Sequence, residues 1–267
     1  MGTQKDIKVV ALDIDGTTFK NGQGPISPRV KKAVQTARDR GVKVALCTGR
    51  WYSIMVNFCH ELGMAPQDLH VTSNGSVVLN TRGDVFDTVP VDTQTLHALI
   101  DPLSEKGIGY GMCDALNFYA NAKGFDAHVD QSHFVLIKDD AEFKKLNYIS
   151  KIYVNCGEEN MDFVENLLKC LPLEYACDFV GEFDIWPSAT NKGVALSKLA
   201  HRYSTNIDHL MFVGDGTNDL MALSMAGLGV AMGQAEDHVK KQADVIAPSF
   251  SEDGAAWAIE EFVLKKQ

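Results

Sequence analysis

The chain has 267 residues, of which 45% are hydrophobic, so it can bury a full core and form one large domain or, as we expect, two modest ones. Its formal net charge of −10 excludes binding to a nucleic-acid backbone, which needs clustered Lys and Arg, but remains compatible with a small anion in a local pocket. Because the sequence lacks the ~18 consecutive apolar residues of a membrane span and an apolar N-terminal signal region, we expect a soluble, cytoplasmic protein without a membrane partner.

Short β-branched runs alternate with amphipathic segments at the start of the chain. Strands are predicted over residues 7–12, 42–46 and 69–72, and helices over residues 28–40 and 52–62. Ser27 before Pro28 is typical of a helix start, and Gly41 of a helix end. This strand–helix alternation predicts a parallel sheet.

The pattern changes between about residue 83 and residue 187. Longer mixed segments appear there, such as residues 151–155 and 179–186, and the glycine-rich residues 107–111 are expected to form a flexible turn. We interpret residues 83–187 as an inserted α+β domain. Since the chain crosses between this insertion and the sheet domain twice, the two crossings can act as a hinge that opens and closes a crevice.

The first pattern returns from residue 188 onward. Helices are predicted over residues 192–203 and 218–226, and strands over residues 210–213, 229–232 and 245–247. We therefore predict an α/β fold in which residues 1–82 and 188–267 form a Rossmann-like core with a parallel sheet. In such a sheet the ligand binds beyond the carboxyl ends of the strands.

Two aspartates, Asp13 and Asp15, directly follow the first predicted strand. A carboxylate can attack phosphorus and form an aspartyl-phosphate, which divides one difficult displacement into two easier ones. Asp13, at the end of the strand, is the candidate nucleophile. Asp15 can protonate the departing oxygen and then accept a proton from the hydrolytic water.

Further polar residues stand at other strand ends and helix starts. Mg²⁺ prefers about six oxygen ligands, so Asp13, Asp215 from a distant loop and a phosphate oxygen suffice to hold it. Thr48, Gly49 and the following arginine offer a hydroxyl, a close backbone N–H and a cation, which indicates a phosphate clamp. Lys192 begins a predicted helix, where it can offset the charge of the same phosphate.

Each motif alone also occurs in ordinary turns and helix starts, and it is their combination at predicted strand ends that favours a catalytic site. The six cysteines are scattered without a CxxC pair, which excludes a tetrahedral zinc site and indicates reduced, mostly buried thiols. A polar group of Asp114, Asn117 and Tyr119 is compatible either with contact to a substrate hydroxyl or with an exposed hairpin.

With these motifs the sequence resembles haloacid dehalogenase superfamily phosphatases of the Cof-like subclass, which carry a type IIB cap. Residues 13–17 match the first family motif, residues 48–50 the second, Lys192 the third and residues 214–219 the fourth. The 143 residues between Thr48 and Lys192, against 34 between Asp13 and Thr48, place the insertion after the second motif, as in the Cof-like group. The family usually has Asn where Gln234 stands.

The resemblance implies roles for individual residues and a Mg²⁺ cofactor. It makes Asp13 the nucleophile and Asp15 the acid/base. The implied metal residues are Asp13, Asp15, Asp215 and Asp219, and the backbone of Ile14 or Asp15 also lies around the metal. The implied phosphate-binding residues are Ile14, Thr48, Gly49, Lys192 and Asn218.

We therefore predict a Mg²⁺-dependent phosphatase that acts on a small phosphorylated metabolite such as a sugar phosphate. A phosphomutase or phosphotransferase with the same core remains an alternative, as does a binding protein without turnover. The intact pair of Asp13 and Asp15 argues against the binding protein, because a phosphate binder needs no nucleophile. The oligomeric state stays open, and a monomer is compatible with the sequence.

Overall fold

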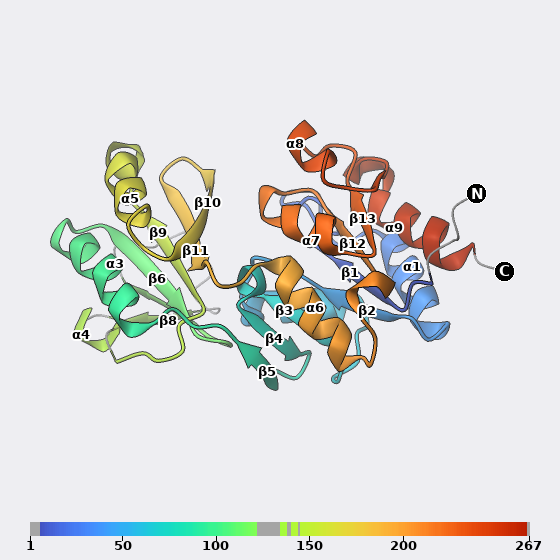
Figure 1. Cartoon of the computed structure of the whole chain (residues 1–267), viewed down its shortest axis with the longest axis horizontal. Helices are drawn as coiled ribbons and strands as arrows, with labels where there is room; N and C mark the ends of the chain where they lie inside the picture. The colour runs from blue at the N-terminus through green and yellow to red at the C-terminus, as the bar shows by residue number, and fades with distance from the viewer. Residues whose placement is uncertain (1–5, 122–133, 138–139, 144, 266–267) are drawn as a thin grey trace.

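The computed structural model describes residues 6–121, 134–137, 140–143 and 145–265, which form two parts lying side by side (Figure 1). The first part contains a five-stranded parallel sheet in the order β14-β13-β12-β1-β2. Its strands are β1 (Val9–Leu12), β2 (Lys43–Leu46), β12 (Leu210–Gly214), β13 (Leu228–Ala231) and β14 (Val245–Ile246). The predicted α/β fold with a parallel core sheet is confirmed.

Helices cover both faces of this sheet because the side chains of each strand alternate between the faces. The helices of this part are α1 (Pro28–Asp39), α2 (Tyr52–Glu61), α6 (Lys192–Arg202), α7 (Leu220–Met225), α8 (Asp237–Lys240) and α9 (Gly254–Ile259). In β1, Val10 and Leu12 pack in one hydrophobic cluster with α1 and α9, whereas Val9 and Ala11 pack in a second cluster with α6 and α7. The side chain of Ser27 caps α1, as predicted, by accepting a hydrogen bond from the Val30 amide.

Short helical turns complete this part of the molecule. They are η1 (Ser73–Gly75), η4 (Ile207–His209), η5 (Thr217–Asp219), η6 (Phe250–Glu252) and the π-helical η7 (Glu260–Leu264). The predicted helix over residues 218–226 is therefore divided between η5 and α7.

The strand predicted over residues 69–72 does exist, but its pairing differs from the expected parallel sheet. This strand, β3 (Leu69–Thr72), pairs antiparallel with β4 (Val77–Asn80), which in turn pairs with β5 (Val85–Thr88). A parallel bridge between Cys47 and Val71 links β3 to the end of β2. Because β5 pairs with β4, it lies with the core although the sequence analysis places residues 85–88 in the insertion.

The second part is a six-stranded mixed sheet with helices on one face, which agrees with the predicted α+β cap. Its strand order is β10-β11-β9-β6-β7-β8. The strands are β6 (Gly109–Cys113), β7 (Phe118–Asn121), β8 (Phe134–Ile137), β9 (Lys151–Asn155), β10 (Leu173–Phe179) and β11 (Glu182–Pro187). The helical segments are α3 (Thr93–Glu105), α4 (Asp140–Phe143), η3 (Glu158–Asn160) and α5 (Met161–Leu168).

The flexible turn predicted over residues 107–111 is wrong, because Gly109 and Gly111 lie in the buried strand β6. A Cβ atom at Gly111 would lie 2.3 Å from the Phe118 ring of the neighbouring strand. Glycine is therefore needed at this position for packing rather than for flexibility.

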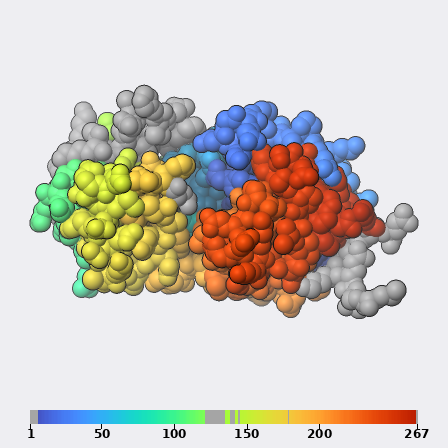
Figure 2. All heavy atoms as spheres, turned by 90° about the horizontal axis from the view of Figure 1, so that it is seen from above, coloured from blue at the N-terminus to red at the C-terminus, as the bar shows by residue number. Residues whose placement is uncertain are grey.

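The helices α3 and α5 lie on the side of the cap sheet away from the core, so its other face is turned toward the core (Figure 1). Seen from above, the surface is hollowed between the two parts, with blue and teal atoms from the early part of the chain in the hollow (Figure 2). In the described part of the chain, no helix combines the length and apolar character needed to cross a membrane.

Candidate active site

Three neighbouring parallel strands bring the predicted motifs to one edge of the core sheet. β1 lies between β12 and β2, with Leu12 in register with both Val213 and Leu46. The residues that follow these strands therefore emerge at the same edge. Asp13 follows β1, Thr48 lies just beyond β2 and Asp215 follows β12.

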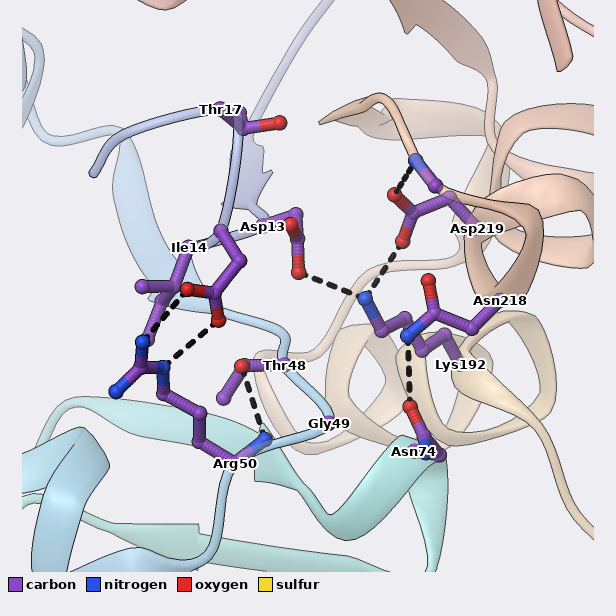
Figure 3. A network of polar contacts seen from close by, with 12 residues as sticks. Asp13, Ile14, Thr17, Thr48, Gly49, Arg50, Asn74, Lys192, Asn218 and Asp219 are labelled. Carbon is purple, nitrogen blue, oxygen red and sulfur yellow. Dashed lines mark hydrogen bonds and ion pairs between the residues drawn. The ribbon is translucent and has the colours of Figure 1, made fainter. Parts of the chain in front are cut away.

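Lys192, the first residue of α6, connects two buried carboxylates in this region (Figure 3). Its Nζ atom lies 2.7 Å from Asp13 Oδ1 and 2.6 Å from Asp219 Oδ1, and only 1% of its side chain is exposed. Burial lowers the pKa of Lys192, but the charges of Asp13 and Asp219 outweigh this effect and raise it, so the ammonium stays charged.

The pKa of Asp13 is raised well above its ordinary value, chiefly by burial. Lys192 opposes this rise, whereas the neighbouring Asp219 and Asp215 add to it. A nucleophilic carboxylate must be ionised, so a further cation beside Asp13 would favour its reactive form.

Asp13, Asp215 and Asp219 offer oxygen atoms that all lie within 4.8 Å of one another, a spacing that fits a cation. Asp219 is the most engaged of the three, because Oδ1 accepts from Lys192 and Oδ2 accepts from the backbone amides of Asp215 and Gly216, both at 2.9 Å. Asp13 and Asp215, which accept fewer hydrogen bonds, could hold a cation directly, whereas Asp219 is engaged with Lys192 and with the loop after β12.

Asp215 is held by the turn that follows β1. Its Oδ1 accepts a hydrogen bond from Thr17 Oγ1 at 3.2 Å. A Cβ atom at Gly16 would lie only 2.1 Å from Asp215 Oδ2, so the turn approaches Asp215 as closely as glycine allows. Gly16 also has a φ of +78°, which side-chain-bearing residues rarely adopt. Burial raises the pKa of Asp215 to about 6.

Asp15 does not join this cluster through its side chain. Its two carboxylate oxygens accept from Arg50 Nε at 2.7 Å and from an Arg50 terminal nitrogen at 2.6 Å, which is a bidentate ion pair. The Arg50 guanidinium lies 5.7 Å from the centre of the Phe19 ring and 5.2 Å from that of Phe58. With 53% of its side chain exposed, Asp15 is accessible to solvent.

The remaining predicted phosphate-binding residues surround the same space (Figure 3). Ile14 follows Asp13 in the loop after β1, and Asn218 lies in η5. Thr48 is buried, and its hydroxyl oxygen accepts from the Arg50 amide at 3.1 Å, which shapes the loop around Gly49. The structure therefore gathers all the predicted site residues at one edge of the sheet, with the Asp15 side chain directed to Arg50.

Gln234 is not among the predicted site residues, although it departs from the family pattern. Its amide nitrogen donates to the Gly16 carbonyl at 2.7 Å and to Asp215 Oδ2 at 3.2 Å, and its amide oxygen accepts from the Phe250 amide. Gln234 therefore ties the turn after β1 to the proposed metal ligand Asp215. The longer Gln side chain supplies this bridge where the family usually has Asn.

Lys151 of β9 is a second residue that the sequence analysis did not identify, and it connects the cap to the core. Its Nζ donates to the Gly49 carbonyl at 2.8 Å and to Asp184 Oδ2 at 2.7 Å, with 4% of the side chain exposed. Beside it, the Trp51 ring stacks on Phe118 of β7 with the ring centres 4.4 Å apart. The cap thus contacts the loop that carries Thr48 and Gly49.

The polar group of Asp114, Asn117 and Tyr119 forms a braced hairpin turn. Asp114 accepts from the amides of Leu116 and Asn117 at 2.7 Å each, and from the Tyr119 hydroxyl at 2.8 Å. The neighbouring Leu116 packs against the core cluster. These contacts account for the polar residues of the turn without a substrate.

Comparisons with known proteins agree with this arrangement. The family model of haloacid dehalogenase-like hydrolases matches residues 10–259. The Bacillus subtilis protein 5-amino-6-(5-phospho-D-ribitylamino)uracil phosphatase YcsE is 30% identical over 261 residues, covering 97% of this chain and 97% of its own. A phosphoglycolate phosphatase from Methanobrevibacter smithii is 26% identical over 261 residues, covering 97% of this chain and 100% of its own.

Solved structures share the whole fold. A phosphatase of the haloalkanoate (HAD) superfamily from Bacteroides thetaiotaomicron is 25% identical with a TM-score of 0.79, covering 98% of this chain and 96% of its own. A HAD subclass IIB sugar phosphatase has a TM-score of 0.78 at 21% identity, with 96% and 98% coverage, which supports the fold alone. With a family match over nearly its full length and the four motifs gathered at one sheet edge, this chain belongs to the haloacid dehalogenase-like hydrolases and is a Cof-like phosphatase.

Proposed function

We propose that the protein is a Mg²⁺-dependent phosphatase that hydrolyses a small phosphorylated metabolite, a sugar phosphate or a similar ester, through an aspartyl-phosphate on Asp13. The observation that carries this proposal is the buried cluster of Asp13, Asp215 and Asp219 with Lys192 at its centre. Three carboxylates and one ammonium leave an excess of negative charge, which suits a divalent cation. Carboxylate oxygens are also the protein ligands that Mg²⁺ prefers.

In the first step an Asp13 oxygen attacks phosphorus and the bond from phosphorus to the ester oxygen breaks. Asp15 gives its proton to the departing oxygen, which leaves as an alcohol. Lys192 and the backbone around Ile14 and Gly49 stabilise the negative charge on the phosphoryl oxygens. When bound by Asp13 and Asp215, Mg²⁺ would supply charge neutralisation and orientation of the phosphate.

In the second step water attacks the phosphorus of the aspartyl-phosphate while Asp15 accepts its proton. The bond from phosphorus to Asp13 breaks, and inorganic phosphate leaves with the nucleophile regenerated. The ion pair with Arg50 orients Asp15. Thr48 and Asn218 complete the phosphate-binding set.

The proposal includes a division of labour between the two parts of the chain. Residues 1–82 and 188–267, together with β5, form the catalytic core, and the rest of the insertion of residues 83–187 is the type IIB cap that excludes bulk water. The pairing of β5 with β4 supports placing the first crossing after Thr88 rather than at residue 83. The contact between Lys151 and Gly49 supports a cap that reaches the phosphate loop when closed.

The test is phosphate release from a panel of phosphorylated sugars, nucleotides and coenzymes, with Mg²⁺ and with EDTA. The panel includes 5-amino-6-(5-phospho-D-ribitylamino)uracil, the ester named for the relative YcsE. We expect metal-dependent release that Asp13→Asn abolishes. Turnover that survives in Asp13→Asn refutes the aspartyl-phosphate mechanism. Isomer interconversion without phosphate release indicates a phosphotransferase, and binding without turnover indicates a binding protein.

A further inference from the structure

The segment η1 (Ser73–Gly75), which follows β3, has an unusual backbone. Its three residues have φ values of 52°, 56° and 101°, a region that Ser adopts rarely and Asn somewhat more readily. Contacts on both sides hold it there. The amides of Ser73 and Asn74 donate to the Arg50 and Thr48 carbonyls at 3.1 and 3.2 Å, and Thr190 Oγ1 donates to the Gly75 carbonyl at 2.9 Å.

This backbone places the Asn74 side chain between two groups of the proposed phosphate site (Figure 3). Asn74 is 2% exposed, and its Oδ1 accepts from Asn218 Nδ2 at 2.9 Å. On the other side, a Cβ atom at Gly49 would lie 2.8 Å from Asn74 Oδ1 and 3.4 Å from its Nδ2. The Asn74 amide thus separates the phosphate loop from η5.

The amide nitrogen of Asn74 has no hydrogen-bond partner among the described residues, although it is buried. Native proteins rarely leave a buried donor unpaired, because such a group loses its hydration without compensation. The adjacent hydroxyls of Thr72, Ser73 and Ser76 are also buried without a partner in the described chain. Four of the seven such side-chain atoms thus fall within residues 72–76, directly beside the loop of Thr48 and Gly49.

We propose that Asn74 is a further substrate-binding residue of this site. Its amide nitrogen donates a hydrogen bond to an oxygen of the bound phosphate, while its amide oxygen holds Asn218 in the orientation that binds the same group. The neutral amide suits this position, since an aspartate of the same shape would repel the phosphate. This inference rests on the proposed phosphatase function.

The test measures binding of tungstate, a dianion of similar shape to phosphate, by calorimetry in Mg²⁺. Asn74→Asp keeps an acceptor for Asn218 but loses the donor, and Asn74→Gly loses the whole amide while tolerating the positive φ. We expect each variant to weaken tungstate binding by about 10- to 100-fold, as for loss of a hydrogen bond to a charged group. The value of kcat/KM for phosphate esters should fall in parallel.

Ser204→Gly is the matched control, because Ser204 is an exposed residue with a φ of 56° that lies outside the site. It should bind tungstate like the wild type. Circular dichroism and melting establish that each variant folds. If Asn74→Gly does not fold, Asn74→Ser removes the amide without adding charge.

Two results would overturn the inference. Weaker binding in Asn74→Asp with unchanged binding in the neutral variant would mean that charge repulsion alone acts. No further loss from Asn74→Gly in an Asn218→Ala background would mean that Asn74 acts only through Asn218. Failure of the wild type both to bind tungstate and to release phosphate would instead refute the proposed function itself.

Discussion

Replacement of Lys192 by methionine tests the electrostatic account of the site most directly. Methionine has a similar length but no charge, so Asp13 and Asp219 lose the ammonium that lies 2.7 and 2.6 Å from their oxygens. Removing one member of a buried ion pair typically costs about 3–5 kcal/mol, because the remaining charge is left uncompensated. Since each kcal/mol lowers the melting temperature of a chain of this size by about 2–4 °C, we expect a decrease of about 6–20 °C.

The assays are urea unfolding, which gives the free energy, and thermal melting, both monitored by circular dichroism in EDTA and in Mg²⁺. Mg²⁺ should restore part of the lost stability because it compensates the same carboxylates. The value of kcat should fall by about 10²–10³, the usual effect of removing one group that stabilises transition-state charge. Lys198→Met is the control, since Lys198 lies on the same helix in a surface ion pair with Asp87 and is 42% exposed. We expect that variant to lie within about 1 kcal/mol of the wild type.

Adding Asp219→Asn to Lys192→Met should restore stability by removing one unpaired charge, but it should not restore kcat. The reasoning is refuted if Lys192→Met in EDTA unfolds with a free energy within about 1 kcal/mol of the wild type. That result would mean that the carboxylates around Lys192 are protonated in the folded protein, so no buried charge is left unpaired.

Burial raises the pKa of Asp215 to about 6, so the folded protein retains a proton that the unfolded chain has already released. Without metal, the stability that this group contributes is therefore present below about pH 4 and is lost as the pH rises through about 6. Urea unfolding in EDTA should show that the wild type loses about 2–3 kcal/mol of unfolding free energy relative to Asp215→Asn over that range. A pH-independent difference between the two proteins would contradict the raised pKa. Lys151→Met should lower kcat/KM by about tenfold, because it loses the hydrogen bond to the Gly49 carbonyl. Lys169→Met on the cap surface is the control and should leave steady-state kinetics unchanged. Equal kinetics in the two variants would exclude a role for the cap contact. Gly16→Ala should abolish turnover and weaken Mg²⁺ binding, measured by calorimetry, because the new Cβ atom would lie 2.1 Å from Asp215 Oδ2. If the variant binds Mg²⁺ as tightly as the wild type does, the turn can shift freely.

Short-range patterns in the sequence determined most of the core. The apolar run of β1 and the Ser27–Pro28 start of α1 depend on neighbouring residues, so they can be recognised without a partner. The convergence of Asp13, Thr48 and Asp215 could also be predicted, because parallel strands present their carboxyl ends at a common edge. The candidate nucleophile, the candidate phosphate loop and the reaction class followed from that rule and from the family motifs.

Strand pairing and long-range side-chain contacts were decided only by the tertiary structure. The period of β3 does not reveal that its partner is β4. Glycines that look like a flexible turn in the sequence lie in β6, where Phe118 fills the space beside Gly111. Lys151 and Gly49 are 102 residues apart in the chain, and Asn74 and Asn218 are 144 apart. Such contacts form because segments that are distant in the chain fold against each other, so no local pattern of charge or periodicity encodes them.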